Sequence, residues 1–172
     1  IKNAITAGIR SIEHGIYLDD EAIEMMLAAG TYLVPTLMAP LGVLDQVERG
    51  LELPEKVIRI ATSVAETHRD SVERAIAAGV KVAMGTDTGV TPHGENLQEL
   101  AEMAKLGMSD DQVLRSSTSV AADLLGVSNE LGTVEVGKIA DLVVWEGESL
   151  DVSDMRSRVS AVIQDGSVVV SH

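Results

Sequence analysis

Three polar residues end three similar segments of the chain. These segments read AITAGIRSIEHG, MLAAGTYLVPTL and AIAAGVKVAMGTD, and each joins an Ala-rich helical end to a glycine and a strand-like run. His14 and Thr36 lie six residues after their glycines, and Asp87 lies eight residues after its glycine. Parallel strands present their carboxyl ends at one edge of a sheet or barrel, where ligands bind. We therefore expect His14 and Asp87 to meet at that edge.

The chemistry that His14 and Asp87 suit is metal-assisted hydrolysis. A neutral imidazole and a carboxylate are good ligands for a divalent ion such as zinc, which lowers the pKa of a bound water toward neutrality. The chain has no cysteine, so a metal here must be held by histidine and carboxylate groups. The competing interpretation is that each residue only caps or closes a turn.

Three polar residues, Thr36 among them, have weaker patterns for a role in binding. His93, in TPHGEN, falls on the loop after the third strand-like run, where it would contact substrate or simply be solvated. Thr36 follows Pro35 and could donate a hydrogen bond to substrate, or only close its strand. His68 lies on an apolar helical stripe, which predicts a hydrogen-bonded histidine with a structural role.

The elements that position these residues alternate between helix and strand. The glycine of each unit suits the left-handed residue that ends a helix. Asp19 or Asp20 can cap a helix that runs to about Ala29, and a second helix is predicted from about Pro54 to Ala78. Strands that alternate with helices of this length imply right-handed crossovers and a parallel sheet. The sequence therefore predicts an α/β protein.

Shorter helices are predicted beyond the third unit. Ser109 and Gln112 form a capping-box pattern ahead of VLRSST. Thr118 can cap the next helix, SVAADLL, which should end at Gly126.

The pattern changes to short strands after Gly132. The segments KIADLVVWE, RVSAVIQDG and SVVVS read as strands, and Asp165-Gly166 is a strong signal for a hairpin between the last two. We place the boundary between the two parts of the chain near residue 130.

Composition and charge exclude several classes of partner. Thirteen Lys and Arg residues against 27 Asp and Glu residues give a net charge of -14 without a basic cluster, so nucleic acid is not the expected ligand. No apolar run approaches the length of a membrane span, and no signal peptide opens the chain. The sequence predicts a soluble, cytoplasmic protein. Ile1 opens the chain within a helical pattern, which indicates a fragment.

Four motifs in order resemble the C-terminal part of a metal-dependent amidohydrolase. They are SIEHG, GVKVAMGTDTG, the segment from TPHGENLQEL to AADLLG, and GTVEVGKIADLVVWEG with VSAVIQDGSVVV. The chain is most similar to the branch that contains imidazolonepropionase and prolidase-like, or Xaa-Pro dipeptidase-like, enzymes. The resemblance implies that residues 1–130 are the C-terminal portion of a (β/α)8 TIM barrel. It also implies that residues 131–172 are C-terminal strands of a small β-sandwich.

The resemblance also implies a site and a cofactor. His14 would end the sixth barrel strand and Asp87 the eighth, as ligands of one or two divalent ions, most simply zinc. Asp87 would be both a ligand and the general base. His14 would bind a second ion, or polarise the carbonyl group where one ion is bound. The family's other ligands, on its first, fourth and fifth strands, have no counterpart here, so the isolated chain should lack most of the metal site.

Two functions from different classes follow. The first is a metal-dependent hydrolase of C–N bonds, cleaving an amide bond of a small dipeptide, N-acyl amino acid or cyclic amide by metal-activated water, with deamination as a variant. The second is a truncated, catalytically incompetent chain of structural interest only. In either case the isolated 172 residues are expected to be inactive. The expected partner is a small amide or dipeptide substrate. The sequence is also compatible with a homo-oligomer.

Overall fold

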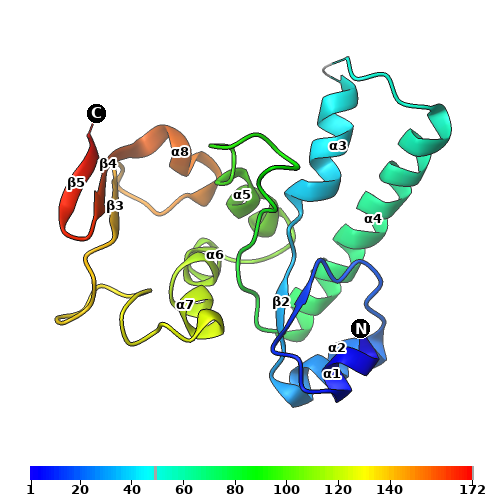
Figure 1. The fold of residues 1–172 in the computed structure, drawn as a ribbon, viewed down its shortest axis with the longest axis horizontal. Helices are drawn as coiled ribbons and strands as arrows, with labels where there is room; N and C mark the ends of the chain where they lie inside the picture. Colours follow the sequence, from blue (N-terminus) through cyan, green and yellow to red (C-terminus); the bar gives the residue numbers. More distant parts are fainter. Residues whose placement is uncertain (49, 172) are drawn as a thin grey trace.

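The computed structural model describes residues 1–48 and 50–171. Helices and strands alternate in the N-terminal half, further helices follow, and an antiparallel sheet ends the chain (Figure 1). The elements, in chain order, are α1 (Lys2–Thr6), β1 (Ser11–Glu13), α2 (Asp20–Ala29), β2 (Tyr32–Val34), α3 (Met38–Glu48), α4 (Glu55–Ala78), α5 (Gln98–Lys105), α6 (Asp110–Ser117), α7 (Ser119–Leu125), β3 (Leu142–Trp145), η1 (Val152–Asp154), α8 (Met155–Arg158), β4 (Val159–Gln164) and β5 (Ser167–Ser171).

Three parallel segments lie side by side, with β2 in the centre. β1 pairs with β2 in parallel, and Leu33 of β2 forms a parallel bridge with Val82 on its other side. The N–H of Leu33 donates to the carbonyl of Lys81 at 2.8 Å, and the N–H of Ala83 donates back to the carbonyl of Leu33 at 2.9 Å. The predicted adjacency of the three glycine-led segments is therefore confirmed.

The third segment is shorter than the sequence predicts. It makes a single bridge to β2, because the next residue of the β2 chain that could donate to it is Pro35, which has no N–H. On the other edge of the segment, the N–H of Met84 donates to the carbonyl of Ser116 at the end of α6. Within the described residues the parallel segments form an open arrangement and do not close into a barrel. The structure thus establishes a mixed α/β fold. This is a less specific result than the closed barrel that the resemblance implies.

Local signals in the sequence fix most helix ends. Asp19 caps α2, where its side chain accepts a hydrogen bond from the N–H of Ala22 at 2.8 Å. Gly30 and Gly79 end α2 and α4 with φ of 68° and 89°, in the left-handed region where a glycine costs least. Helix α4 begins directly after Pro54, as predicted.

The junction between α6 and α7 confirms one predicted cap and corrects another. Both hydrogen bonds of the capping box between Ser109 and Gln112 are present, and Gly126 ends α7 in the left-handed region. Thr118 occupies the N-cap position of α7, as predicted, but its side chain makes no capping hydrogen bond there. Its hydroxyl donates to the carbonyl of Leu114 at 2.7 Å, because α7 follows α6 directly and Thr118 still lies beside the last turn of α6.

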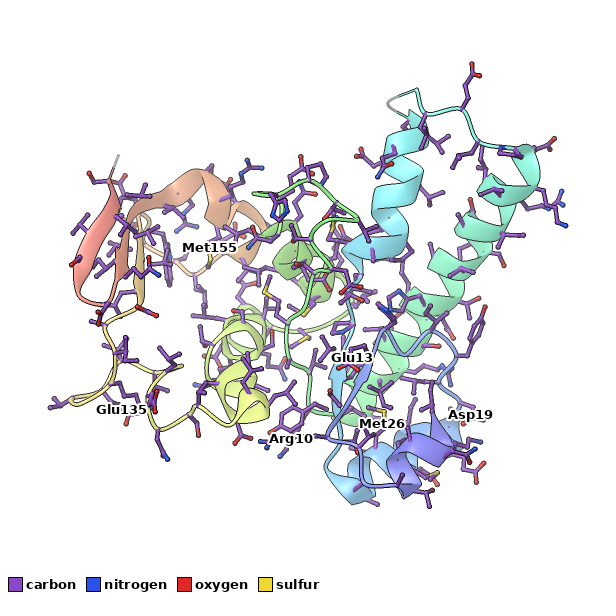
Figure 2. The ribbon with its side chains drawn as sticks, in the orientation of Figure 1. Arg10, Glu13, Asp19, Met26, Glu135 and Met155 are labelled. Carbon is purple, nitrogen blue, oxygen red and sulfur yellow. The ribbon has the colours of Figure 1, made fainter. Side chains whose placement is uncertain are left out.

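One hydrophobic cluster joins the helices to the parallel segments. Met26 of α2, Leu33 of β2, Val72 of α4 and Met103 of α5 are all completely buried in it. Met155 extends the same cluster toward the C-terminal sheet, and Figure 2 shows it in α8, between that sheet and α5.

The opposite ends of the strands are tied to α7. The Tyr32 hydroxyl donates to the Asp123 carboxylate, and the Arg10 guanidinium donates to the Asp123 carbonyl. The hydrogen bond to Asp123 raises the pKa of Tyr32, with burial adding to the effect. These contacts hold the amino ends of β1 and β2 against α7. The carboxyl ends of the strands take no part in them.

The C-terminal sheet is antiparallel, in the order β3-β4-β5. The predicted Asp165-Gly166 hairpin joins β4 to β5, with Asp165 at φ 47° and Gly166 at φ 75°. Valines on β3 and β5 stay largely exposed, including Val143 at 48% and Val168 at 64%. This sheet therefore carries apolar surface that the described residues do not cover. None of the described helices is both long and apolar enough to cross a membrane.

Gly85 tests how closely the end of β2 packs on the third parallel segment. A Cβ atom at this position would lie 2.4 Å from Val34 Cγ1 and 3.2 Å from Thr36 Cγ2. We expect Gly85→Ala to destabilise the complete protein by about 1–3 kcal/mol through overpacking, measured as a lower thermal midpoint. Val34→Ala should relieve most of this loss, because it removes the clashing methyl group.

The control is Gly79→Ala, where no atom lies within 4 Å of the added Cβ. That variant should lose about 1 kcal/mol through left-handed strain alone, and Val34→Ala should not rescue it. If the stability losses of Gly85→Ala and Val34→Ala simply added in the double variant, the packing explanation would be contradicted.

Candidate active site

His14 and Asp87 meet at the carboxyl ends of the parallel segments. His14 Nε2 lies 3.6 Å from Asp87 Oδ2, and the two side chains are 43% and 44% exposed. The N–H of His14 continues the β1–β2 ladder by donating to the carbonyl of Val34 at 2.8 Å. The predicted juxtaposition is therefore confirmed, and the pair is accessible to a ligand. The chemical roles of the two residues stay predictions.

The three strand-ending residues share an unusual backbone conformation. His14, Thr36 and Asp87 have φ of 66°, 51° and 50°, in the left-handed region. Such residues cost of order 1–3 kcal/mol each and cluster at active sites and ligand clamps, and a β-branched residue like threonine is rare there. The turns at this edge thus hold their side chains at an energetic cost.

The hydroxyl of Thr36 orients the imidazole of His14. Thr36 Oγ1 donates to the carbonyl of Pro35 at 2.7 Å and also contacts His14 Nδ1. A hydroxyl has one hydrogen, so the second contact requires His14 Nδ1–H to donate to Thr36. For the neutral imidazole this assigns the Nδ1–H tautomer, in which the lone pair of Nε2 faces Asp87. Thr36 itself is 1% exposed.

His68 supports the same edge from α4. It is completely buried, and its Nε2 lies 2.8 Å from the carbonyl of His14, to which it donates. Burial lowers the pKa of His68, which keeps the imidazole neutral near pH 7. Its Nδ1 has no hydrogen-bond partner among the described residues. The predicted buried, hydrogen-bonded histidine is confirmed.

Glu99 is a buried acid that the sequence analysis did not identify. It is completely buried in the first turn of α5, where one carboxylate oxygen accepts the N–H of Leu37 at 2.8 Å and the other accepts the N–H of Met38 at 2.9 Å. The pKa of Glu99 is raised to about 7, mainly by burial and in part by the nearby charges of Glu102 and Asp87, against the lowering effect of these two hydrogen bonds. Its spacing from Met103, on one face of the helix, was the available signal.

His93 lies apart from this network. It is exposed on the loop that follows Asp87, and no described contact joins it to His14, Thr36 or Asp87. The structure therefore brings together three of the four predicted site residues.

The side chains of His14 and Asp87 provide part of the ligand set that a divalent metal ion requires. Two ligands about 2.1 Å from one zinc ion at a tetrahedral angle lie about 3.4 Å apart, and the observed separation is 3.6 Å. Within residues 1–48 and 50–171, however, no group of three or more His, Cys, Asp or Glu side chains converges. The pair can supply two ligands of the three or four that zinc usually takes from protein.

Comparison with known proteins gives a consistent family. The profile of the Amidohydrolase family matches residues 1–170. Among solved structures, a Xaa-Pro dipeptidase with bound methionine in its active site is 39% identical, with a TM-score of 0.89 over 99% of this chain and 42% of that chain. A prolidase complexed with N-methylphosphonate-L-proline is 34% identical, with a TM-score of 0.85 over 98% of this chain and 42% of that chain.

Curated sequences extend the comparison. Imidazolonepropionase of Maricaulis maris (strain MCS10) is 34% identical over 142 residues, which are 80% of this chain and 30% of the relative. 5-Methylthioadenosine/S-adenosylhomocysteine deaminase of Desulforudis audaxviator (strain MP104C) is 32% identical over 139 residues, 68% of this chain and 31% of the relative. The chain thus spans under a third of the length of these curated relatives.

The buried carboxyl of Glu99 predicts a pH-dependent contribution to stability. Its pKa is about 7 when folded, against 4.5 for the ordinary group, so between these values the native state holds a proton that the unfolded state has released. Stability should fall as pH rises from about 4.5 to about 7, by on the order of 3 kcal/mol in total. Glu99→Gln removes this titration.

The measurement is the thermal midpoint of the complete protein across that pH range. The difference between wild type and Glu99→Gln should change with pH, whereas the exposed substitution Glu24→Gln should give a curve parallel to wild type. Parallel curves for all three proteins would contradict the raised pKa of Glu99.

Proposed function

The chain belongs to the amidohydrolase family, and we propose that the complete protein is a metal-dependent hydrolase of C–N bonds. Its substrate is an amide bond of a small dipeptide, N-acyl amino acid or cyclic amide. The observation that carries this proposal is the 3.6 Å approach of His14 Nε2 to Asp87 Oδ2 at the carboxyl edge of parallel strands.

His14 and Asp87 are the proposed ligands for one or two divalent ions, with zinc as the candidate. When bound, such an ion lowers the pKa of a coordinated water toward neutrality and polarises a carbonyl oxygen. His14 suits this role because its Nδ1–H is committed to Thr36, so that in the neutral imidazole Nε2 carries the lone pair that a metal ion requires. Further ligands would come from parts of the protein beyond these residues.

Asp87 is the proposed catalytic base. A carboxylate has two oxygens, so one can bind the metal while the other accepts a proton from the attacking water. The water oxygen adds to the amide carbonyl carbon, the C–N bond breaks, and Asp87 passes the proton to the leaving nitrogen. The products are a carboxylic acid and an amine, and Asp87 returns to its ionised form.

Thr36 and His93 are proposed to influence substrate binding. His93 is exposed on the loop after Asp87 and has room to contact a substrate directly. The hydroxyl of Thr36 already contacts Pro35 and His14, so its influence on substrate would pass through the imidazole.

The relatives support a small substrate with a peptide-like bond. The two solved relatives are described as a Xaa-Pro dipeptidase and as a prolidase in complex with a phosphonate of proline. A tetrahedral phosphonate has the shape expected when water adds to a carbonyl carbon. We therefore favour a dipeptide or N-acyl amino acid over a larger substrate.

Deamination is the second candidate function. The similarity to a methylthioadenosine and adenosylhomocysteine deaminase, 32% identical, favours it. The same two residues would serve that reaction, because water would add to a ring carbon and Asp87 would deliver the proton to departing ammonia. The identity to the dipeptidase, 39%, is higher, so amide hydrolysis stands first.

We further propose that residues 1–130 belong to a (β/α)8 barrel and residues 131–172 to a small β-sandwich. The open row of parallel segments supports the first assignment, because further strands could pair with the free side of β1. The exposed valines of β3 and β5 support the second, since they offer apolar surface to strands from elsewhere in the protein.

Asp87→Asn in the complete protein tests the function. The change keeps the volume of the side chain but removes the negative charge and the proton acceptor. We expect kcat for hydrolysis of a panel of Xaa-Pro dipeptides and N-acyl amino acids to fall by about 10²- to 10⁴-fold, with little change in the thermal midpoint. Glu24→Gln, an exposed substitution on α2, is the matched control and should keep wild-type kcat.

If Asp87 only closes a turn, the opposite should be seen. Stability would fall by about 1 kcal/mol, while turnover per folded molecule would stay within about threefold of wild type. That result would remove Asp87 from the proposed chemistry.

Zinc binding gives a separate prediction. His14 and Asp87 provide two ligands, so the isolated 172 residues should not retain zinc stoichiometrically after dialysis, as measured by elemental analysis. The complete protein should retain it, and His14→Ala should weaken the retention. Tight, stoichiometric zinc in the isolated chain would mean that ligands are supplied in another way, for example by a second copy.

A further inference from the structure

Glu99 occupies an unusual position for an acid. Its carboxylate is completely buried and accepts two backbone N–H groups, those of Leu37 and Met38. Within residues 1–48 and 50–171 these two N–H groups are its hydrogen-bond partners, and no basic side chain forms an ion pair with it. A buried carboxylate is costly unless its hydrogen bonds are satisfied, and here both oxygens are used to hold one short turn.

The turn that Glu99 holds is the start of α3. A helix leaves its first N–H groups unpaired, and these are usually capped by the side chain of the residue just before the helix. Leu37, the residue just before α3, has no hydrogen-bond acceptor in its side chain. The hydroxyl of Thr36, one residue earlier, is committed to Pro35 and to His14 Nδ1. Glu99 caps α3 from a different helix, α5, and so leaves the hydroxyl of Thr36 available to His14.

This division of roles links Glu99 to the active site through three contacts. Glu99 holds the N–H groups of residues 37 and 38, the same turn keeps Thr36 at φ 51°, and Thr36 accepts His14 Nδ1–H. His14 Nε2 then faces Asp87 at 3.6 Å. Without the two bonds from Glu99, the left-handed strain at Thr36 would be free to relax and to carry the hydroxyl away from the imidazole.

We propose that Glu99 is a positioning residue of the active site, which fixes the turn at residues 36–38 and thereby holds His14 in the tautomer that presents a free Nε2 to Asp87. The inference rests on the proposed function, because positioning has a catalytic consequence only if His14 and Asp87 act on substrate or metal. Its structural part, the dependence of the His14 tautomer on Glu99, does not require activity.

The experiment compares Glu99→Gln with Leu100→Ala in the complete protein. Glu99→Gln keeps the volume, but its amide can accept only one of the two N–H groups and turns a donor toward the other. Leu100 is 2% exposed in the same helix, so Leu100→Ala removes packing but keeps the Glu99 carboxylate that accepts the two N–H groups of the turn. The first readout is the ¹⁵N spectrum of His14 in chelator-treated protein, assigned by its loss in His14→Gln.

Wild type and Leu100→Ala should both show the Nδ1–H tautomer of His14. Glu99→Gln should show a mixture with the Nε2–H tautomer. The second readout is kcat, which should fall by about 10- to 100-fold in Glu99→Gln, the range for residues that orient metal ligands. Leu100→Ala should keep kcat per folded molecule even where its thermal midpoint falls further than that of Glu99→Gln.

An unchanged His14 spectrum in Glu99→Gln would overturn the proposal, as would an equal change in Leu100→Ala. If Glu99→Gln does not fold, Glu99→Asp decides, because it keeps the charge and withdraws the carboxylate by one methylene group. An unchanged His14 spectrum in Glu99→Asp would also overturn it. If Asp87→Asn retains activity, the proposed function fails, and the spectrum of His14 still decides the structural part.

Discussion

The parallel pairing around β2 is the constraint on which the site depends. β2 bonds β1 on one side and the segment around Val82 on the other, so three chain segments far apart in sequence end at the same edge. Leu33, at the centre, is completely buried, and this fixes which face of each segment points into the core. A slip in either pairing would separate His14 from Asp87.

The two edges of this strand arrangement are built differently. At the amino ends, Tyr32, Arg10 and Asp123 form a polar brace to α7, and the left-handed residues there are glycines, which carry little strain. At the carboxyl ends, three residues adopt left-handed backbone and two side chains remain partly exposed. Strain and exposure thus concentrate where parallel α/β proteins bind ligands, and bracing concentrates at the other end.

Buried polar groups connect the strained turns to the surrounding helices. His68 of α4 holds the carbonyl of His14, and Glu99 of α5 holds the N–H groups that follow Thr36. Each of these residues lies on a mostly apolar helix face, where a polar side chain is costly unless it is satisfied. Their presence indicates that the helices orient the strand ends in addition to packing against them.

The sequence by itself determined the local and periodic features of this protein. Glycine positions, the Asp19 cap, the capping box at Ser109 and the Asp165-Gly166 hairpin all depend on residues within a few positions of one another. The alternation of helix and strand implied parallel strands, and from that the meeting of His14 with Asp87. The family resemblance followed from the order of the same motifs.

Only the tertiary structure decided how the site is held. The hydroxyl of Thr36 turns to His14, and the acid of Glu99 caps a helix 61 residues before it in the chain. The hydroxyl of Thr118 likewise bonds the last turn of α6 instead of capping α7. A polar side chain has several partners within reach in an unfolded chain, and the one it takes depends on which groups burial leaves without water. That choice is made by contacts distant in sequence, which local patterns do not encode.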